Sequence, residues 1–237
     1  MTLLNVSEEW KKTYPGAKIG VLALRNVVNS RQHPALDAIK LELEAALRAQ
    51  YAGYDRQALR ALPTMQVYHN YYKRFKKTYH VQHQLESVAL KGKPIPTAAA
   101  LVEAMFMAEL KNQLLTAGHD LDSLQMPVGI DVALGGEQYT GISGREQTTK
   151  PADMMIADTQ GIISSILYGP DRRTCITPTT RRALFTVYGP QGITRDAVQT
   201  HLLDIETYVR LIAPAAEIEL SNVYGADFSP ETEKMVQ

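Results

Sequence analysis

Two glutamates lie in the most apolar stretch of this sequence, where a carboxylate is costly to bury. Residues 98–115 place Ala, Leu, Val, Met and Phe on every face of a helix, and Glu103 and Glu109 lie among them. A helix that is apolar all round is a buried helix. A buried carboxylate needs a cation or several N–H donors, or it takes up a proton. Each glutamate therefore either pairs inside the fold, Glu103 with an arginine from the sheet, or lines a pocket for a cationic or donor-rich ligand.

The histidines and the single cysteine offer fewer chemical options. His80 and His83 would share one face of a helix, a spacing that suits a metal ion, but no third ligand accompanies them at a recognisable spacing. Cys175 lies in a strand-like run without a partner, so we expect a buried, inert thiol and no disulfide. The sequence has no G-x-G-x-x-G, G-K-[ST] or G-x-S-x-G pattern. It predicts no metal, no cofactor and no serine triad.

A basic and aromatic segment covers residues 68–80, which read YHNYYKRFKKTYH. Residues 55–93 hold eight Lys or Arg against two Asp or Glu, although the whole chain has 25 of each sign. Cations bind phosphates, and exposed rings stack on unpaired bases, so the segment predicts an RNA surface. Its alternative is a solvated helix face with the aromatic rings turned inward. The cations of this candidate RNA surface are Lys73, Arg74, Lys76 and Lys77, with Arg172 and Arg173 from a second cluster.

Composition and length favour one domain. The chain has 237 residues, 45% hydrophobic, with neither an internal repeat nor a linker-like stretch. A net charge of zero excludes a uniformly basic coat. The N-terminus has no basic start, and the longest apolar stretch is interrupted by charges, so we expect a cytoplasmic protein with no signal peptide and no membrane span. We expect a domain over 1–225, with its core at about 15–212, and a polar tail over 226–237.

The hydrophobic pattern predicts an α+β fold, with helices early and a mostly antiparallel sheet later. We expect helices over 34–50, 55–62, 68–75 and 98–115 and a last one after Thr194. A cap at Asn29 or Ser30 would begin the first of these helices, and a cap at Thr97 the helix over 98–115. We expect strands at 17–28, 128–134, 138–142, 154–157, 162–167, 174–176, 184–187 and 218–220, with a hairpin turn at Gly135-Gly136.

Several short motifs resemble a known family when taken in order. They are Lys91-Gly92-Lys93-Pro94-Ile95-Pro96, Leu101-Val102-Glu103, Gly118-His119-Asp120-Leu121-Asp122, residues 152–158, and Ile176-Thr177-Pro178-Thr179-Thr180. This series resembles the B3/B4 domain, the editing domain of the bacterial phenylalanyl-tRNA synthetase beta subunit, which also occurs as free-standing proteins. The resemblance covers about residues 15–212. It implies a B3/B4-like single α+β domain.

The resemblance also implies an activity. The sequence has no synthetase core, ATP motif or anticodon-binding module, so the implied role is trans-editing: hydrolysis of the ester of a mischarged aminoacyl-tRNA. Such an ester is already activated, and the site need only position water and stabilise an oxyanion. His119 is the candidate to orient water or bind the terminal ribose. Alternatively, His119 and Asp120 form a local cap before the turn at Asp122. Backbone N–H groups near Tyr168 and Gly169 are the candidates for the oxyanion.

Departures from the family pattern change the expected substrate. Met105 and Phe106 replace a Thr-Asn pair, Ala117 stands where the editing histidine would align, and Phe185 stands where the editing glutamate would. The groups that recognise tyrosine are therefore missing, whereas Glu109 is new. A pocket carboxylate suits a guanidine-like side chain. Some free-standing members act on tRNA(Arg) mischarged with canavanine, and this is the substrate we expect. Expected substrate contacts are Glu103, Glu109, Met105, Phe106, Tyr168 and Gly169.

Two other functions stay open from the sequence. A non-catalytic tRNA- or RNA-binding module would keep the cations at 73–77 without needing Glu109 or His119. An amino-acid-binding protein would keep the pocket without the cations. The resemblance implies aminoacyl-tRNA as the partner, and we expect no membrane and infer no protein partner.

Overall fold

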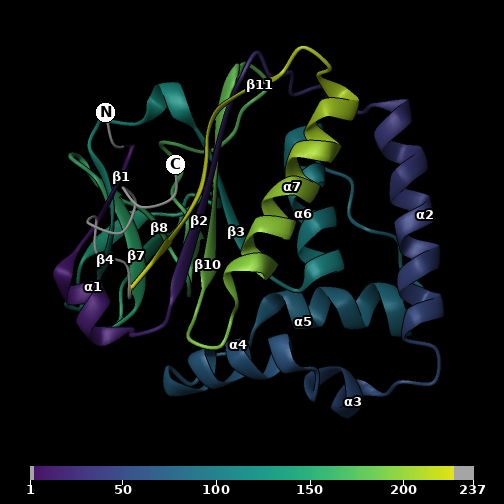
Figure 1. The fold of residues 1–237 in the computed structure, drawn as a ribbon, viewed down its shortest axis with the longest axis horizontal. Coiled ribbons are helices and arrows are strands. Elements are labelled where there is room, and N and C mark those ends of the chain that lie inside the picture. The colour runs from purple at the N-terminus through teal and green to yellow at the C-terminus, as the bar shows by residue number, and fades with distance from the viewer. Residues whose placement is uncertain (1–2, 227–237) are drawn as a thin grey trace, which may run out of the picture.

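The computed structural model describes residues 3–226 and consists of two facing sheets covered by helices on one side (Figure 1). A four-stranded sheet lies in the centre in the order β11-β2-β10-β3, and a five-stranded sheet lies beside it in the order β1-β4-β7-β8-β9. Helices α6 and α7 cover the other face of the four-stranded sheet, and α2 lies outside them. This order of layers places α6 between the sheet and α2.

The central sheet is antiparallel throughout. Its strands are β2 (Lys18–Arg25), β3 (Leu115–Asp120), β10 (Arg182–Gly189) and β11 (Glu217–Gly225). β2 and β10 are buried on both faces, as their nearly continuous apolar sequences predict. β3 is the edge strand of this sheet, and it pairs with β10 from Ala183 opposite Asp120 to Tyr188 opposite Leu115. The edge position leaves β3 beside the connections of the second sheet.

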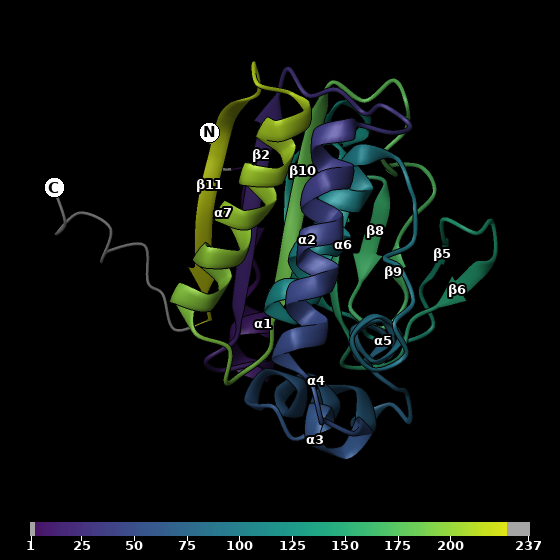
Figure 2. The ribbon, with the colours of Figure 1, turned by 90° about the vertical axis from the view of Figure 1, so that its right-hand side faces the viewer.

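The second sheet is antiparallel except at one edge, where β1 runs parallel to β4. Its strands are β1 (Leu4–Val6), β4 (Val128–Val132), β7 (Met154–Asp158), β8 (Gly161–Ser165) and β9 (Gly169–Pro170). The hairpin of β5 (Gln138–Thr140) and β6 (Glu146–Thr148) projects from the molecule beside β8 and β9 (Figure 2). The Ser164 and Tyr188 hydroxyls, 2.6 Å apart, join the two sheets.

Two long helices have one apolar face each, and α6 is apolar on all sides. The long helices are α2 (Pro34–Gln50) and α7 (Arg195–Ile212), and α6 covers Ala100–Asn112. Thr194 caps α7 by accepting the Ala197 N–H at 3.1 Å. Gln113, at φ +62°, ends α6 in a left-handed turn, and the chain then enters β3. α6 and β3 are therefore close neighbours in the sequence and in space.

Short helices form the end of the molecule opposite the start of α2. They are α3 (Arg56–Arg60), α4 (Pro63–Arg74) and α5 (His80–Leu85), followed by a π-helical turn at Glu86–Leu90 (Figures 1 and 2). Another short helix, α1 (Glu8–Thr13), packs near β4. None of the helices in the described part of the chain combines the length and apolar character needed to cross a bilayer.

The α+β class and the mostly antiparallel sheets are confirmed, as are the helices at 34–50 and after Thr194. Several boundaries were wrong. α6 is shorter than 98–115 because of the turn at Gln113, and Ala99 rather than Thr97 begins it. α2 begins after His33, with Pro34 in its first turn, rather than at a cap on Asn29 or Ser30. Residues 174–176 form no strand; Cys175 makes a single bridge to His119.

The predicted hairpin at Gly135-Gly136 was also wrong. Both glycines have positive φ, as a turn requires, but β4 pairs with β1 and β7, while β5 pairs with β6. The C-terminal strand extends to Gly225. The domain boundary at 225 stays a prediction, and residues 227–237 of the predicted tail lie outside the described residues.

Candidate functional site

A cavity of about 420 Å³ lies where α6, β3, α5 and the β8–β9 connection meet. Four of the predicted substrate contacts line it: Met105, Phe106, Glu109 and Gly169. Its walls are mostly apolar, and its polar lining residues are few: His80, Glu109, Thr116, Ser165, Cys175 and Tyr188. An apolar cavity with a few converging polar groups is typical of small-molecule sites. We call this cavity the α6 pocket.

Gly118 shapes one wall of the α6 pocket. A Cβ atom at this position would lie 2.8 Å from the Ile176 side chain and 3.4 Å from Met105 Sδ. Glycine therefore lets β3 approach both side chains closely.

Glu109 is the buried carboxylate of the α6 pocket. It is 1% exposed, and one oxygen accepts the Thr116 backbone N–H at 2.8 Å. No Lys, Arg or His nitrogen lies within 4 Å of its carboxylate among residues 3–226. Burial raises the pKa of Glu109 to about 8, and the Thr116 N–H opposes that rise only in part. The carboxyl group is therefore mainly protonated at pH 7.

Glu103 lies on the same helix but not in the pocket. Its carboxylate accepts the Ala98 N–H at 2.7 Å and pairs with Lys40 of α2 at 3.1 Å. Both side chains are buried, and Asp37 adds a second acidic partner to Lys40 at 3.2 Å. The structure therefore does not support substrate binding by Glu103. Its partner also differs from the prediction: the cation is a lysine of the outer helix, not an arginine of the sheet.

His80 is the imidazole that lines the α6 pocket. Its ring remains open to solvent and packs edge-on against Tyr72 and Tyr79. Protein atoms nevertheless surround it on most sides, and this desolvation lowers the pKa of His80 to about 4, with a smaller contribution from His83. The ring is neutral at pH 7 and has a nitrogen free to accept a proton. The sequence analysis considered His80 only as a metal ligand, predicted no metal, and missed its position at the pocket.

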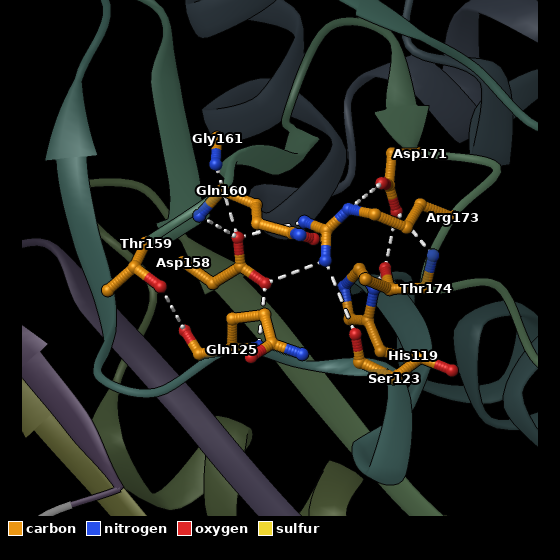
Figure 3. Close-up of polar contacts among 10 residues, drawn as sticks. All are labelled: His119, Ser123, Gln125, Asp158, Thr159, Gln160, Gly161, Asp171, Arg173 and Thr174. Carbon is orange, nitrogen blue, oxygen red and sulfur yellow. Dashed lines mark hydrogen bonds and ion pairs between the residues drawn. The ribbon is translucent and has the colours of Figure 1, made fainter.

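His119 follows Gly118 on β3 and does not line the pocket. Its side chain is fully buried, and Nδ1 lies 2.8 Å from the Thr174 hydroxyl (Figure 3). Because that hydroxyl donates to Asp171, His119 Nδ1–H must donate to Thr174. Burial, and then Arg173, lower the pKa of His119 to about 3. The predicted catalytic role of His119 is therefore not supported: its ring is neutral, enclosed and separated from the cavity.

Asp120 does act as the local cap that the sequence offered as an alternative. Its side chain accepts the Asp122 N–H at 3.1 Å and begins a 3₁₀ turn at Leu121–Ser123. Its second oxygen accepts the Thr180 hydroxyl at 2.7 Å.

Arg173 lies at the surface next to His119, with 33% of its side chain exposed. Its guanidinium makes two hydrogen bonds with Asp158, at 2.8 and 2.9 Å, and one with the Ser123 carbonyl, at 3.2 Å (Figure 3). Arg173 therefore balances the buried Asp158 carboxylate from the surface, and its role in tRNA binding stays a prediction. Arg172 is exposed and lies next to Gly144 of the β5–β6 hairpin.

The aromatic rings of residues 68–80 face the interior, as the alternative interpretation held. Tyr68, Tyr71, Tyr72, Phe75 and Tyr79 are all buried. Tyr68 and Tyr79 stack on each other, with ring centroids 4.3 Å apart, and the Tyr71 hydroxyl donates to Asp153 at 2.8 Å. These rings cannot stack on RNA bases. The predicted stacking platform was therefore wrong.

The cations of the same segment face outward. Lys73, Arg74 and Lys76 are exposed. Arg74 lies 5.4–5.6 Å from the rings of Tyr14, Tyr71 and Phe75. Lys77 Nζ lies 4.2 Å above the ring of Tyr168, the residue before Gly169 of the α6 pocket. Lys77 thus places a positive charge next to the pocket.

Tyr168 and Cys175 differ in part from their predictions. Tyr168 does not line the α6 pocket, and its N–H is already used by Ser165 Oγ at 3.2 Å, so it is a poor oxyanion donor. Cys175 is half-buried and lines the pocket instead of lying in the core. Burial raises the pKa of its thiol, which keeps it protonated. Within residues 3–226, no three His, Cys, Asp or Glu side chains cluster as metal ligands would.

Comparisons with known proteins give a weak likeness of fold. No family model matches the chain, and no curated protein matches it. Among solved structures, it is similar to an N-terminal fragment of the phenylalanyl-tRNA synthetase beta subunit from Pyrococcus horikoshii, with a TM-score of 0.46 and 11% identity. The similarity covers 93% of this chain and 53% of the other, so the chain spans about half the length of that fragment.

Proposed function

We propose that this protein hydrolyses the ester of a mischarged aminoacyl-tRNA, and that its substrate is canavanyl-tRNA(Arg). The observation that carries the proposal is Glu109: a buried carboxyl group without a cationic partner among the described residues, in the wall of an otherwise apolar cavity. The order of motifs that resembles the B3/B4 domain supports the same class of reaction. Lys77, beside the pocket, offers a first contact for a tRNA phosphate.

The proposed role of Glu109 is to read the amino-acid side chain. A protonated carboxyl group presents one O–H donor and one carbonyl acceptor and has no net charge. The oxyguanidine of canavanine is much less basic than guanidine, so it can enter in its neutral form and satisfy both groups. The guanidinium of arginine stays charged. It would lose its hydration in an apolar pocket that offers no counter-charge until Glu109 releases its proton.

The reaction itself needs a positioned water and little else, since the ester is already activated. His80 is the group we propose to accept the proton from that water, because its ring is neutral and accessible at the pocket. The neighbouring hydroxyl of the terminal ribose, which a tRNA substrate would supply, is the alternative group to orient the water. As the ester bond breaks, the released ribose oxygen takes up the proton. The role first expected for His119 thus moves to a histidine on α5.

The test is deacylation of pre-charged tRNAs at neutral pH. The panel contains canavanyl- and arginyl-tRNA(Arg), tyrosyl- and phenylalanyl-tRNA(Phe), and one unrelated pair. We expect selective loss of the canavanyl ester. Loss of a different mischarged ester would keep the editing activity and overturn the substrate. If no ester is hydrolysed while tRNA still binds, the protein is a binding module; if free amino acids bind and tRNA does not, it is an amino-acid-binding protein.

A further inference from the structure

A second concavity, of about 630 Å³, lies on the surface of α3 and α4. Four basic side chains line it: Arg56, Arg60, His69 and Lys73. The carboxamides of Gln57, Gln66 and Asn70 are the other polar groups, and no Asp or Glu is among its lining residues. We call it the α3–α4 basin. It is separate from the α6 pocket, with which it shares no lining residue.

The positive charges of the basin are only partly balanced. Arg56 pairs with Glu86 at 3.1 Å. Among residues 3–226, neither Arg60 nor Lys73 has a carboxylate within 4 Å. The Arg60 guanidinium instead contacts His69 Nε2. Because arginine only donates hydrogen bonds, His69 must accept this one and is therefore neutral.

The pKa of His69 reflects the repulsion among these positive groups. Its pKa is lowered, first by burial and then by the charges of Arg60 and Lys73. An anion placed between these side chains would raise the pKa of His69. A protonated His69 could then donate a hydrogen bond to that anion. Arginine and lysine with amide donors around one hollow are the groups that bind phosphate oxygens.

We propose that the α3–α4 basin binds phosphate groups of an RNA backbone. The choice of RNA rests on the proposed function, because a deacylase must hold a tRNA whose 3′ end enters the α6 pocket. Lys73 lies in the last turn of α4, and Lys77 follows shortly after the helix and reaches Tyr168 beside the pocket. Lys73 and Lys77 thus place positive charges both at the basin and beside the α6 pocket. A backbone bound in the basin lies beside this series of charges.

The test measures binding of a fluorescein-labelled, 20-nucleotide single-stranded RNA at several salt concentrations. The Arg60→Ala/Lys73→Ala variant removes two basin cations, and Lys12→Ala/Arg31→Ala removes two exposed cations outside the basin. For single strands, each phosphate contact contributes about 0.7 to the slope of log K against log salt. We expect the basin variant to bind roughly 10-fold more weakly with a slope smaller by about 1.4, and the control to match wild type. An unchanged slope, or an equal loss in the control, would overturn the proposal.

Two further measurements show whether the basin binds RNA or a small phosphate, and whether His69 contacts the phosphate. If inorganic pyrophosphate binds wild type and the basin variant alters only that binding, the basin is a small-phosphate site and the RNA proposal is overturned. RNA affinity should rise when the pH falls from 7.5 to 6.0, as His69 protonates among Arg56, Arg60 and Lys73. The His69→Asn variant should lose this rise; a rise that persists would exclude His69 as a phosphate ligand.

This experiment is independent of the reaction. The RNA carries no aminoacyl ester, so a failure of deacylation leaves the binding result intact. Conversely, a basin variant with normal RNA binding would overturn the proposed phosphate site and leave the proposed hydrolysis in place.

Discussion

Helix α6 buries two carboxylates on neighbouring turns, and the fold balances only one of them. Lys40 neutralises Glu103 at 3.1 Å, and the Ala98 N–H completes its coordination. Glu109 receives one backbone N–H and no cation among the described residues, and it lies beside a cavity. The difference separates a structural carboxylate from one that is available to a ligand. Burial alone does not distinguish the two; the partner does.

The same contrast holds for two histidines. His119 is enclosed by a cluster in which Arg173, Asp158, Thr174 and Asp171 satisfy one another (Figure 3). His80 opens into the α6 pocket and makes only ring contacts with Tyr72 and Tyr79. Both are neutral at pH 7, but only His80 can meet a substrate. Each residue type thus has one member that the fold balances or encloses and one member that lines the α6 pocket.

The largest expected effect comes from removing the cation of Glu103. The Lys40→Met variant leaves that carboxylate buried and unbalanced, which costs about 3–5 kcal/mol in the free energy of unfolding. Urea denaturation measures the loss. The double variant Lys40→Met/Glu103→Leu should recover most of it, because an apolar pair tolerates burial. A single variant as stable as wild type would show that the ion pair does not distinguish Glu103 from Glu109.

Substitution of His80 should affect the deacylation rate, whereas substitution of His119 should affect stability. We expect His80→Asn to lower the deacylation rate by about 100-fold, the range of a lost general base, with little change in stability. His119→Asn should lower the melting temperature and leave the rate of the folded protein unchanged. Single-turnover deacylation and thermal unfolding of both variants make the comparison. The opposite pattern, with activity lost only in His119→Asn, would restore the assignment made from sequence.

A smaller effect follows from the protonation of Glu109. Its pKa in the folded state, about 8, lies above the value of 4.5 for an exposed glutamate. The folded state therefore binds the proton more tightly, and the stability that this proton provides is lost as the pH rises toward 8. Between pH 6.5 and 8, wild type should lose about 2 kcal/mol more than Glu109→Gln, at up to about 1.4 kcal/mol per pH unit. Equal pH profiles for the two proteins would show that Glu109 is already ionised in the fold.

Much of the fold was predictable because its signals are local. The apolar spacing of α2 and α7, the Thr194 cap and the apolar run of β2 depend on neighbouring residues alone. β3 was missed because its sequence, Leu115–Asp120, is short and contains glycine, and it continues a helical pattern that ends only at Gln113. The parallel pairing of β1 with β4 joins segments more than a hundred residues apart, and no local pattern predicts it.

The candidate site was predictable in part. Glu109 was notable as a carboxylate in an apolar helix, the motif resemblance indicated Met105 and Phe106, and the cavity includes all three. The partner of Glu103 was not predictable, because Lys40 lies on another helix and only the packing of α2 on α6 brings it close. His80 was missed because its role depends on where α5 packs. Its spacing to His83 suggested a metal, whereas its position makes it a wall of the α6 pocket.

The measurement that tests the account most directly is kcat/KM for canavanyl-tRNA(Arg) with wild type, Glu109→Leu and Glu44→Gln. Glu44 is the matched control: a buried glutamate outside the α6 pocket, held by the Ile95 N–H at 2.8 Å and Arg48 at 3.0 Å. An unpaired polar group of the substrate costs about 1–3 kcal/mol, so Glu109→Leu should lower kcat/KM about 10- to 100-fold, with the control near wild type. Unchanged hydrolysis by folded Glu109→Leu would contradict the claim that Glu109 reads the substrate.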